Sequence, residues 1–359
     1  MRVLTVVGAR PQFIKAAPVS RVLRRDHEEY LVHTGQHYDE EMSAVFFSEL
    51  GIPEPDIDLG VGSGSHGKQT GEMLASIERV LEEQSPDVVM VYGDTNSTLA
   101  GALAAAKLCI PVAHVEAGLR SFDRTMPEEV NRVVTDHVSE ALFAPTETAV
   151  ENLHREGLVA GVELVGDVML DAARLYAEMP DASEVLARFG IEPGRYCLAT
   201  VHRAGNTDDP ERLASILEAF ARLSLPVVFP CHPRTLKSIE RSGLRDRLTG
   251  TSVMLTDPVS YGTLMALLGS AACVLTDSGG MQKEAYFFGV PCVTLRENTE
   301  WIETVEAGWN TLVGADPEAI VAAVECRDRP AERPAFYGDG HAAERVVGAL
   351  EQRFGAQAT

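Results

Sequence analysis

Short apolar runs alternate with amphipathic stretches along almost the whole chain. Six runs in the first half are rich in Val and Leu without strict alternation, which is typical of parallel strands buried on both faces. Helical patterns follow all but the last of them, directly or after a loop. The six runs cover residues 2–8, 28–35, 86–94, 110–116, 140–146 and 162–167. This order predicts repeated strand–helix units that build a parallel sheet.

A second series of the same kind follows. Its strands are predicted at 196–202, 226–232, 252–258, 272–278, 291–296 and 310–314, with helical patterns clearest at 209–223 and 261–271. We interpret the polar stretch 181–195 as the connection between the two series. The pattern therefore predicts an α/β protein with two doubly wound Rossmann-like domains, residues 1–168 and 169–339, that face a cleft. A final helix at about 340–359 is expected to pack back on the first domain.

Length and composition agree with this organisation. The chain has 359 residues, too many for one ordinary core, and no apolar stretch long enough to span a bilayer. Its first residues have a strand pattern rather than that of a signal peptide, so we expect a cytoplasmic protein. The six cysteines show no C-x-x-C pairing and are interpreted as reduced thiols, with a structural zinc site not expected.

The charge of the chain excludes one class of partner. A net charge of −22 argues against nucleic acid, whose phosphates require a basic surface. Only five of the 31 basic residues are lysines. We hypothesise a halophilic source, because concentrated salt screens the repulsion of an acidic surface. A GC-rich genome that favours arginine codons is the alternative.

Two nucleotide-binding motifs are nearly present but incomplete. The segment GSGSHGKQT at 62–70 has Gln69 where a P-loop requires a Ser or Thr hydroxyl for magnesium. We interpret it as a loop that opens a helix. The first strand-to-helix turn, GARPQF at 8–13, lacks the G-x-G-x-x-G fingerprint of dinucleotide sites, which disfavours an NAD enzyme.

Charged and polar residues gather where predicted strands end. In open parallel sheets ligands bind beyond the carboxyl ends of strands, so we expect these residues to converge on one cleft. They are Arg10 and Lys15 after the first strand, Asp94 and Glu116 after the third and fourth, and His202, Arg203, His232, Arg234 and Asp277–Gly280 in the second series.

The segment DSGG at 277–280 has the properties of a phosphate cradle. Two glycines let the backbone approach an anion, and the N–H groups and dipole of the following helix favour negative charge. Glu284, one turn into that helix, can accept hydrogen bonds from sugar hydroxyls. The second domain is therefore predicted to bind a nucleoside diphosphate, with Arg10, Lys15, His202 and Arg203 supplying positive charge.

Several motifs together resemble a known family. The segments GARPQFIKAAPV, VYGDTNST, HVEAGLR…PEEVNR, TVHR, CHPRT and LTDSGGMQKEA look like those of the non-hydrolysing UDP-N-acetylglucosamine 2-epimerases, in the same order. The resemblance implies a fold like that of GT-B glycosyltransferases, a homodimer, and interconversion of UDP-GlcNAc and UDP-ManNAc. It also implies a UDP-sugar as substrate, no redox cofactor and no required metal.

The resemblance also implies roles for individual residues. Asp94, Glu116 and Glu128 match the catalytic carboxylates of the family and His202 its catalytic-site histidine. Arg10, Lys15, Ser278, Gly279, Gly280 and Glu284 match UDP-binding positions. Glu129, Asn131 and Arg132 stand beside Glu128 in PEEVNR as supporting residues, while Arg203 and His232 come from the strand-end argument.

The family reaction explains the dense charges at 114–132. It eliminates UDP to give 2-acetamidoglucal and adds UDP back with the opposite configuration at C2. One carboxylate cannot reach both faces of a ring, so two acid/base groups on opposite sides are needed. Which of Asp94, Glu116 and Glu128 acts on which face stays open at this point.

The sequence leaves more than one sugar open as the substrate. The stretch TEWIETVEAGWN at 299–310 is similar to a branch that includes archaeal members and enzymes acting on UDP-2,3-diacetamido-2,3-dideoxyglucuronate. A hydrolysing epimerase and a GT-B glycosyltransferase are further alternatives, as is a non-catalytic sugar-nucleotide sensor. Turnover of a UDP-sugar without an acceptor would separate the epimerases from the last two.

Overall fold

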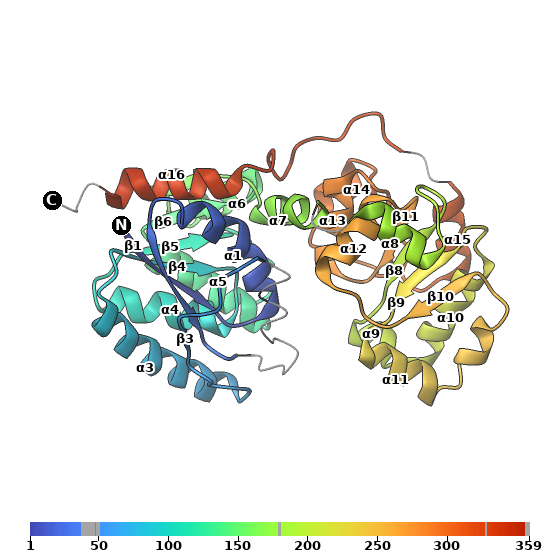
Figure 1. The fold of residues 1–359 in the computed structure, drawn as a ribbon, viewed down its shortest axis with the longest axis horizontal. Coiled ribbons are helices and arrows are strands. Elements are labelled where there is room, and N and C mark those ends of the chain that lie inside the picture. The colour runs from blue at the N-terminus through green and yellow to red at the C-terminus, as the bar shows by residue number, and fades with distance from the viewer. Residues whose placement is uncertain (37–46, 48–50, 179–180, 327–328, 356–359) are drawn as a thin grey trace. The chain divides into compact units, whose positions relative to one another are not determined.

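The computed structural model describes residues 1–36, 47, 51–178, 181–326 and 329–355 (Figure 1). The chain divides into two compact units. The N-terminal unit comprises Met1–Arg174 with Ala335–Thr359, and the C-terminal unit comprises Leu175–Pro334. Each is described separately below.

The N-terminal unit is built on a parallel sheet in the order β3-β2-β1-β4-β5-β6-β7. All six expected strands are confirmed, and β3 was not expected. The strands are β1 Arg2–Val7, β2 Glu28–His33, β3 Ile57–Asp58, β4 Val88–Tyr92, β5 Val112–Val115, β6 Ala141–Ala144 and β7 Val162–Leu164. Strand β4 is buried throughout, as expected for a strand covered on both faces.

Helices alternate with these strands along the chain. They are α1 Arg10–Leu23, α3 His66–Gln84, α4 Asn96–Lys107, α5 Pro127–Val138, α6 Glu147–Arg155, α7 Val168–Ala177 and, from the end of the chain, α16 Ala342–Phe354. Helix α3 opens within the segment 62–70, as predicted for the incomplete P-loop. Helix α16 packs against α1, so the C-terminal segment completes the N-terminal unit (Figure 1).

The C-terminal unit repeats the architecture with the order β10-β9-β8-β11-β12-β13, also parallel. Its strands are β8 Cys197–Thr200, β9 Val227–Pro230, β10 Val253–Thr256, β11 Cys273–Thr276, β12 Cys292–Thr294 and β13 Asn310–Leu312. Its helices are α8 Ala182–Phe189, α9 Ala204–Thr207, α10 Pro210–Arg222, α11 Pro233–Arg241, α12 Tyr261–Gly269, α13 Gly279–Phe288, α14 Ile302–Glu306 and α15 Pro317–Glu325, with a 3-10 turn at Arg245–Leu248. The expected fold class, two doubly wound α/β units, is confirmed.

The stretch 181–195 is not simply a connection. It contains α8, which packs against α12 inside the C-terminal unit. The Asp181 side chain caps the helix by accepting the Ser183 N–H at 2.8 Å, and Gly190 ends it with a φ of 63°. These two residue types at the ends of a helix are the usual start and stop signals.

In both units the strand order reverses at the centre of the sheet. The chain moves outward in one direction from β1 and in the other from β4, and likewise from β8 and β11. Loops that leave such neighbouring strands diverge, and the crevice at their carboxyl ends is where doubly wound folds bind ligands. Among the described residues, no helix is both long and apolar enough to cross a membrane.

Gly348 lies in the interior of α16, and a Cβ added there would meet nothing within 4 Å. We expect Gly348→Ala to raise the free energy of unfolding by about 0.5–1 kcal/mol, because alanine loses less backbone entropy in a helix. Urea denaturation measures the change. Gly101 in α4 is the matched control, since its added Cβ would lie 3.1 Å from Val91 and 3.2 Å from Val6. Equal stabilisation by both substitutions would contradict this reasoning.

Candidate active site

Two carboxylates stand at the ends of neighbouring strands in the N-terminal unit. Asp94 follows β4 and Glu116 follows β5, and each is paired with a cation from a helix. Arg132 Nη2 lies 2.6 Å from Asp94 Oδ2, and Lys15 Nζ forms an ion pair with Glu116 Oε2. A Cβ added at Gly93 would lie 3.2 Å from both Lys15 Nζ and Glu116 Oε2. The Asp94–Arg132 and Glu116–Lys15 ion pairs therefore lie next to the same turn of the chain, at Gly93.

Glu116 has an unusual backbone conformation. Its φ is 75°, in the left-handed region that residues with a side chain rarely adopt. The N–H groups of Glu116 and Ala117 both donate to Phe143 O, each at 3.1 Å, where β5 ends beside β6. Such a conformation costs about 1–3 kcal/mol and persists only where surrounding contacts impose it, most often at functional sites.

Arg132 connects Asp94 to a second carboxylate. Its Nη1 donates to Glu129 Oε2 at 3.0 Å, and Glu129 also accepts the N–H groups of Ser121 and Phe122. Burial alone would raise the pKa of the Glu129 carboxyl, but these hydrogen bonds outweigh it and hold the pKa below its usual range. Glu129 thus fixes Arg132 and the loop before α5. Glu128 is exposed in the first turn of the same helix, as is Arg10 at the start of α1.

Asp277 organises the corresponding edge of the C-terminal unit. It follows β11 and accepts the backbone N–H groups of His202 and Arg203, each at 3.0 Å, from the segment that follows β8. Asn206 Nδ2 donates to it at 3.0 Å. Because β8 and β11 are the central pair where the order reverses, this contact lies at the switch point of the sheet.

His202 lies in a positive environment. Its ring centroid is 6.0 Å from that of His232, which begins α11. Burial lowers the pKa of His202, Asp277 raises it, and His232, Arg203 and Arg234 lower it again, with a net result below the usual value. The imidazole is therefore neutral at pH 7 and can donate a hydrogen bond to an anion beside the arginines.

Helix α13 begins with the two glycines of the DSGG segment. The Ser278 side chain caps it by accepting the Met281 N–H at 3.4 Å. A Cβ added to Gly279 would lie 3.4 Å from Glu300, 3.6 Å from Trp301 and 3.8 Å from Arg203. These are ordinary contact distances, so Glu300, Trp301 and Arg203 surround the start of the helix, whose first N–H groups suit a phosphate.

One turn further, Glu284 is buried and accepts the Tyr261 hydroxyl at 2.7 Å. The C-terminal unit thus brings together the predicted residues His202, Arg203, His232, Ser278, Gly279, Gly280 and Glu284 along one edge of its sheet. Among the described residues, no group of three or more His, Cys, Asp or Glu side chains could hold a metal ion.

Some residues at the two sheet edges were not among the predicted site residues. Glu129 was expected only in a supporting position beside Glu128 in PEEVNR, not as the acceptor that holds Arg132 and the loop before α5. Asp277 was recognised as part of DSGG but not as the acceptor that fixes the segment after β8. Trp301, whose Nε1 donates to Gly279 O at 2.8 Å, comes from the stretch 299–310, which the sequence analysis used only to compare branches of the family.

Comparisons with known proteins extend over almost the whole chain. A family model described as UDP-N-acetylglucosamine 2-epimerase matches residues 21–351. A Methanococcus maripaludis protein named UDP-N-acetylglucosamine 2-epimerase homolog is 52% identical over 355 residues, 98% of this chain and 99% of the relative. A Pseudomonas aeruginosa protein named UDP-2,3-diacetamido-2,3-dideoxy-D-glucuronate 2-epimerase is 50% identical over 357 residues, 97% of this chain and 98% of the relative.

A solved structure matches equally broadly. The crystal structure of Methanocaldococcus jannaschii UDP-GlcNAc 2-epimerase in complex with UDP-GlcNAc and UDP has a TM-score of 0.84 and 45% sequence identity to this chain. The match covers 98% of this chain and 100% of that one.

Proposed function

This chain belongs to the UDP-N-acetylglucosamine 2-epimerase family, and on that basis we propose that it interconverts UDP-GlcNAc and UDP-ManNAc. The observation that carries the proposal is the pair of carboxylates at the ends of β4 and β5. Asp94 and Glu116 stand on neighbouring strands, each beside a cation from a different helix. Inversion at C2 requires acid/base groups of this kind, because a proton must leave one face and return to the other.

We propose that the reaction proceeds by elimination and re-addition. A carboxylate removes the C2 proton while the C1–O bond to UDP breaks, which gives 2-acetamidoglucal and UDP. A second carboxylate then delivers a proton to the opposite face of C2, and the UDP oxygen re-forms the bond to C1. Asp94, Glu116 and Glu128 are the candidate acid/base groups, and His202 is the fourth catalytic residue.

The remaining predicted residues are proposed to bind UDP and to stabilise it as a leaving group. Arg10, Lys15, Arg132, Arg203 and His232 supply positive charge or hydrogen bonds, and the start of α13 at Ser278–Gly280 supplies backbone N–H groups. The chain as a whole is acidic, so these residues would concentrate positive charge at the proposed site. A diphosphate would be attracted there and not to the rest of the surface.

A second substrate is favoured by one observation. The relative named for UDP-2,3-diacetamido-2,3-dideoxy-D-glucuronate is 50% identical, above the 45% of the Methanocaldococcus jannaschii UDP-GlcNAc 2-epimerase. The same elimination chemistry would serve that sugar, since both substrates carry an acetamido group at C2. We therefore retain the diacetamido uronate as the alternative substrate.

The test is to incubate purified protein with each UDP-sugar separately, without acceptor or NAD, and to identify the products by proton NMR. We expect UDP-GlcNAc to be converted to an equilibrium mixture with UDP-ManNAc. Conversion of the diacetamido uronate alone would establish the alternative substrate. Free ManNAc with UDP would indicate a hydrolysing enzyme, and no change in either sugar would contradict the epimerase assignment.

We also propose a cytoplasmic homodimer that is adapted to high salt. The family resemblance supports the dimer, and the net charge of −22 supports the salt adaptation. Light scattering of the purified protein measures its mass in solution. A stability curve that stays flat between low and molar KCl would contradict the salt adaptation.

Glu284 provides a test of the proposed nucleotide site. We expect Glu284→Ala to weaken UDP binding about tenfold or more, because it removes a charged acceptor for the ribose hydroxyls. Tyr261→Phe removes only the hydroxyl that holds Glu284 and should have a smaller effect. Calorimetric titration with UDP measures both. An unchanged dissociation constant for Glu284→Ala would exclude Glu284 from the site.

A further inference from the structure

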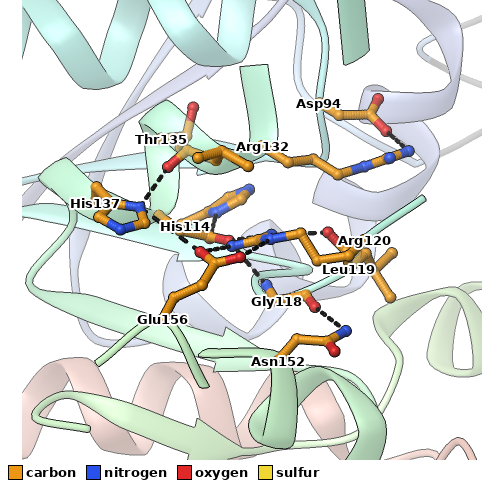
Figure 2. A network of polar contacts seen from close by, with 12 residues as sticks. Asp94, His114, Gly118, Leu119, Arg120, Arg132, Thr135, His137, Asn152 and Glu156 are labelled. Carbon is orange, nitrogen blue, oxygen red and sulfur yellow. Dashed lines mark hydrogen bonds and ion pairs between the residues drawn. The ribbon is translucent and has the colours of Figure 1, made fainter. Parts of the chain in front are cut away.

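A buried group of side chains lies directly behind the turn that carries Glu116. His114 is the third residue of β5, Asp136 lies on α5, and both are fully buried. His114 Nδ1 is 2.7 Å from Asp136 Oδ1, and its Nε2 is 2.7 Å from Gly93 O. Figure 2 shows His114 in this network beside Arg120.

Each ring nitrogen of His114 faces an acceptor oxygen. A carbonyl oxygen only accepts, so Nε2 must donate to Gly93 O. Burial alone would raise the pKa of Asp136, but the hydrogen bond and charge of His114 and the charge of Arg120 hold it below its usual range. The Asp136 carboxylate is therefore ionised at neutral pH and accepts hydrogen bonds.

Asp136 also binds two residues that follow Glu116 in the chain. Its Oδ2 accepts the Gly118 N–H at 3.1 Å and lies 2.7 Å from Arg120 Nη1. Arg120 in turn binds both oxygens of Glu156, at 2.7 and 2.8 Å (Figure 2). One carboxylate thus binds residues on both sides of Glu116, whose φ of 75° needs such support.

The group formed by His114 and Asp136 also contacts Gly93, the residue before Asp94. Gly93 donates its N–H to Val115 O at 3.0 Å and accepts from His114 with its carbonyl, so β5 holds both backbone groups of the residue before Asp94. Asn131, also on α5, donates to Asp94 O at 2.9 Å. The positions of Asp94, Glu116 and the helix that bears Glu128 are therefore linked through Asp136 and His114.

We propose that Asp136 and His114 are positioning residues for the epimerisation, which keep the backbone around Asp94 and Glu116 in the arrangement that proton transfer at C2 requires. This inference rests on the proposed function. Neither residue contacts the substrate, and both act through the catalytic carboxylates. Displacement of a catalytic group by about 1 Å is enough to lower a rate about 100-fold.

The test compares three variants at a temperature where each is folded. Asp136→Ala should lower kcat about 100-fold while KM and the dissociation constant of UDP change less than about threefold. Asp136→Asn should recover most of this loss. Its amide nitrogen can donate to a neutral His114 that keeps the proton on Nε2, while its oxygen still accepts from Gly118 and Arg120.

Glu29→Ala is the matched control. Glu29 is a buried carboxylate on β2, with hydrogen bonds from Thr5 and Arg24 at 2.7 Å each, near the amino-terminal end of the sheet. Its removal should lower stability but leave kcat nearly normal. A kcat for Asp136→Ala within threefold of wild type, or a loss equal to that of the control, would overturn the proposal.

Two further experiments apply if Asp136→Ala does not fold or if the wild-type protein shows no turnover. If Asp136→Ala does not fold, His114→Gln replaces it, because a glutamine amide cannot donate to both Asp136 and Gly93 in the same geometry. If the wild-type protein turns over neither UDP-sugar, the proposed function fails, and a crystal structure of the variant still tests the inference. Glu116 leaving the positive-φ region supports it, and an unchanged backbone at Gly93 and Glu116 overturns it.

Discussion

Glu116→Gln is expected to lower turnover at least about 100-fold, the usual contribution of one general acid or base. The substitution preserves the shape of the side chain and its hydrogen bond from Lys15 but removes the ability to take up a proton at neutral pH. Because the residue lies beside β5 and not among the proposed phosphate contacts, UDP binding should change only a few-fold. Steady-state kinetics and calorimetric titration with UDP measure the two effects.

The comparison between kcat and binding decides what Glu116 does. A mutant that loses turnover and keeps UDP affinity has lost an interaction of the transition state. Near-normal turnover would remove Glu116 from the mechanism and leave Asp94 and Glu128 as the acid/base groups. A parallel loss of UDP affinity would assign it to binding together with Lys15.

Gly118→Ala is expected to lower the free energy of unfolding by about 2–5 kcal/mol. Gly118 has a φ of 81°, and a Cβ added there would lie 2.3 Å from the backbone oxygen of Ala149 and 2.9 Å from Leu153 Cγ. Backbone of α6 cannot move aside as a flexible side chain could. Urea denaturation measures the loss.

Gly157 separates the two causes of that loss. Its φ of 83° is nearly the same, but an added Cβ would meet nothing within 4 Å. Gly157→Ala should therefore cost only the left-handed strain, about 1–2 kcal/mol. The excess at Gly118 measures the steric clash. Equal losses at the two positions would show that the close approach to α6 has no energetic effect.

Most of the fold could be predicted because its strands are distinct in sequence. Runs such as 86–94 contain buried Val, Met and Tyr residues and end at a glycine or a carboxylate, and the order of such runs defines a doubly wound sheet. β3 was missed because it has only two residues, Ile57 and Asp58, within a segment of alternating polarity and glycines. A strand this short has no period to detect.

Helix α8 was missed for a different reason. The proline and glycine of 181–195 lie after the helix, at Gly190 and beyond, yet they dominated the interpretation of the whole stretch. Asp181 at the start and Gly190 at the end are helix signals, but the helix between them is short and the stretch as a whole is polar. The residues at its two ends therefore indicate this helix better than the average polarity of the stretch does.

The strand-end residues could be predicted from the topology, but their supporting contacts could not. Glu116 and Asp94 follow strands whose order is readable from the sequence. Asp136 lies in the interior of an amphipathic helix, where nothing local distinguishes it from a solvent-facing carboxylate. Its burial against His114 and Arg120 arises only when α5 packs beside β5, which is a tertiary contact.

The most direct measurement is the isotopic content of C2 after turnover in D2O. Wild-type protein is incubated with UDP-GlcNAc and the C2 position of both sugars is followed by proton NMR. Proton removal and return by side-chain carboxylates predicts deuterium at C2 of the UDP-ManNAc formed, introduced with epimerisation. Formation of UDP-ManNAc that retains the original C2 hydrogen would contradict a mechanism in which these carboxylates exchange that proton with solvent.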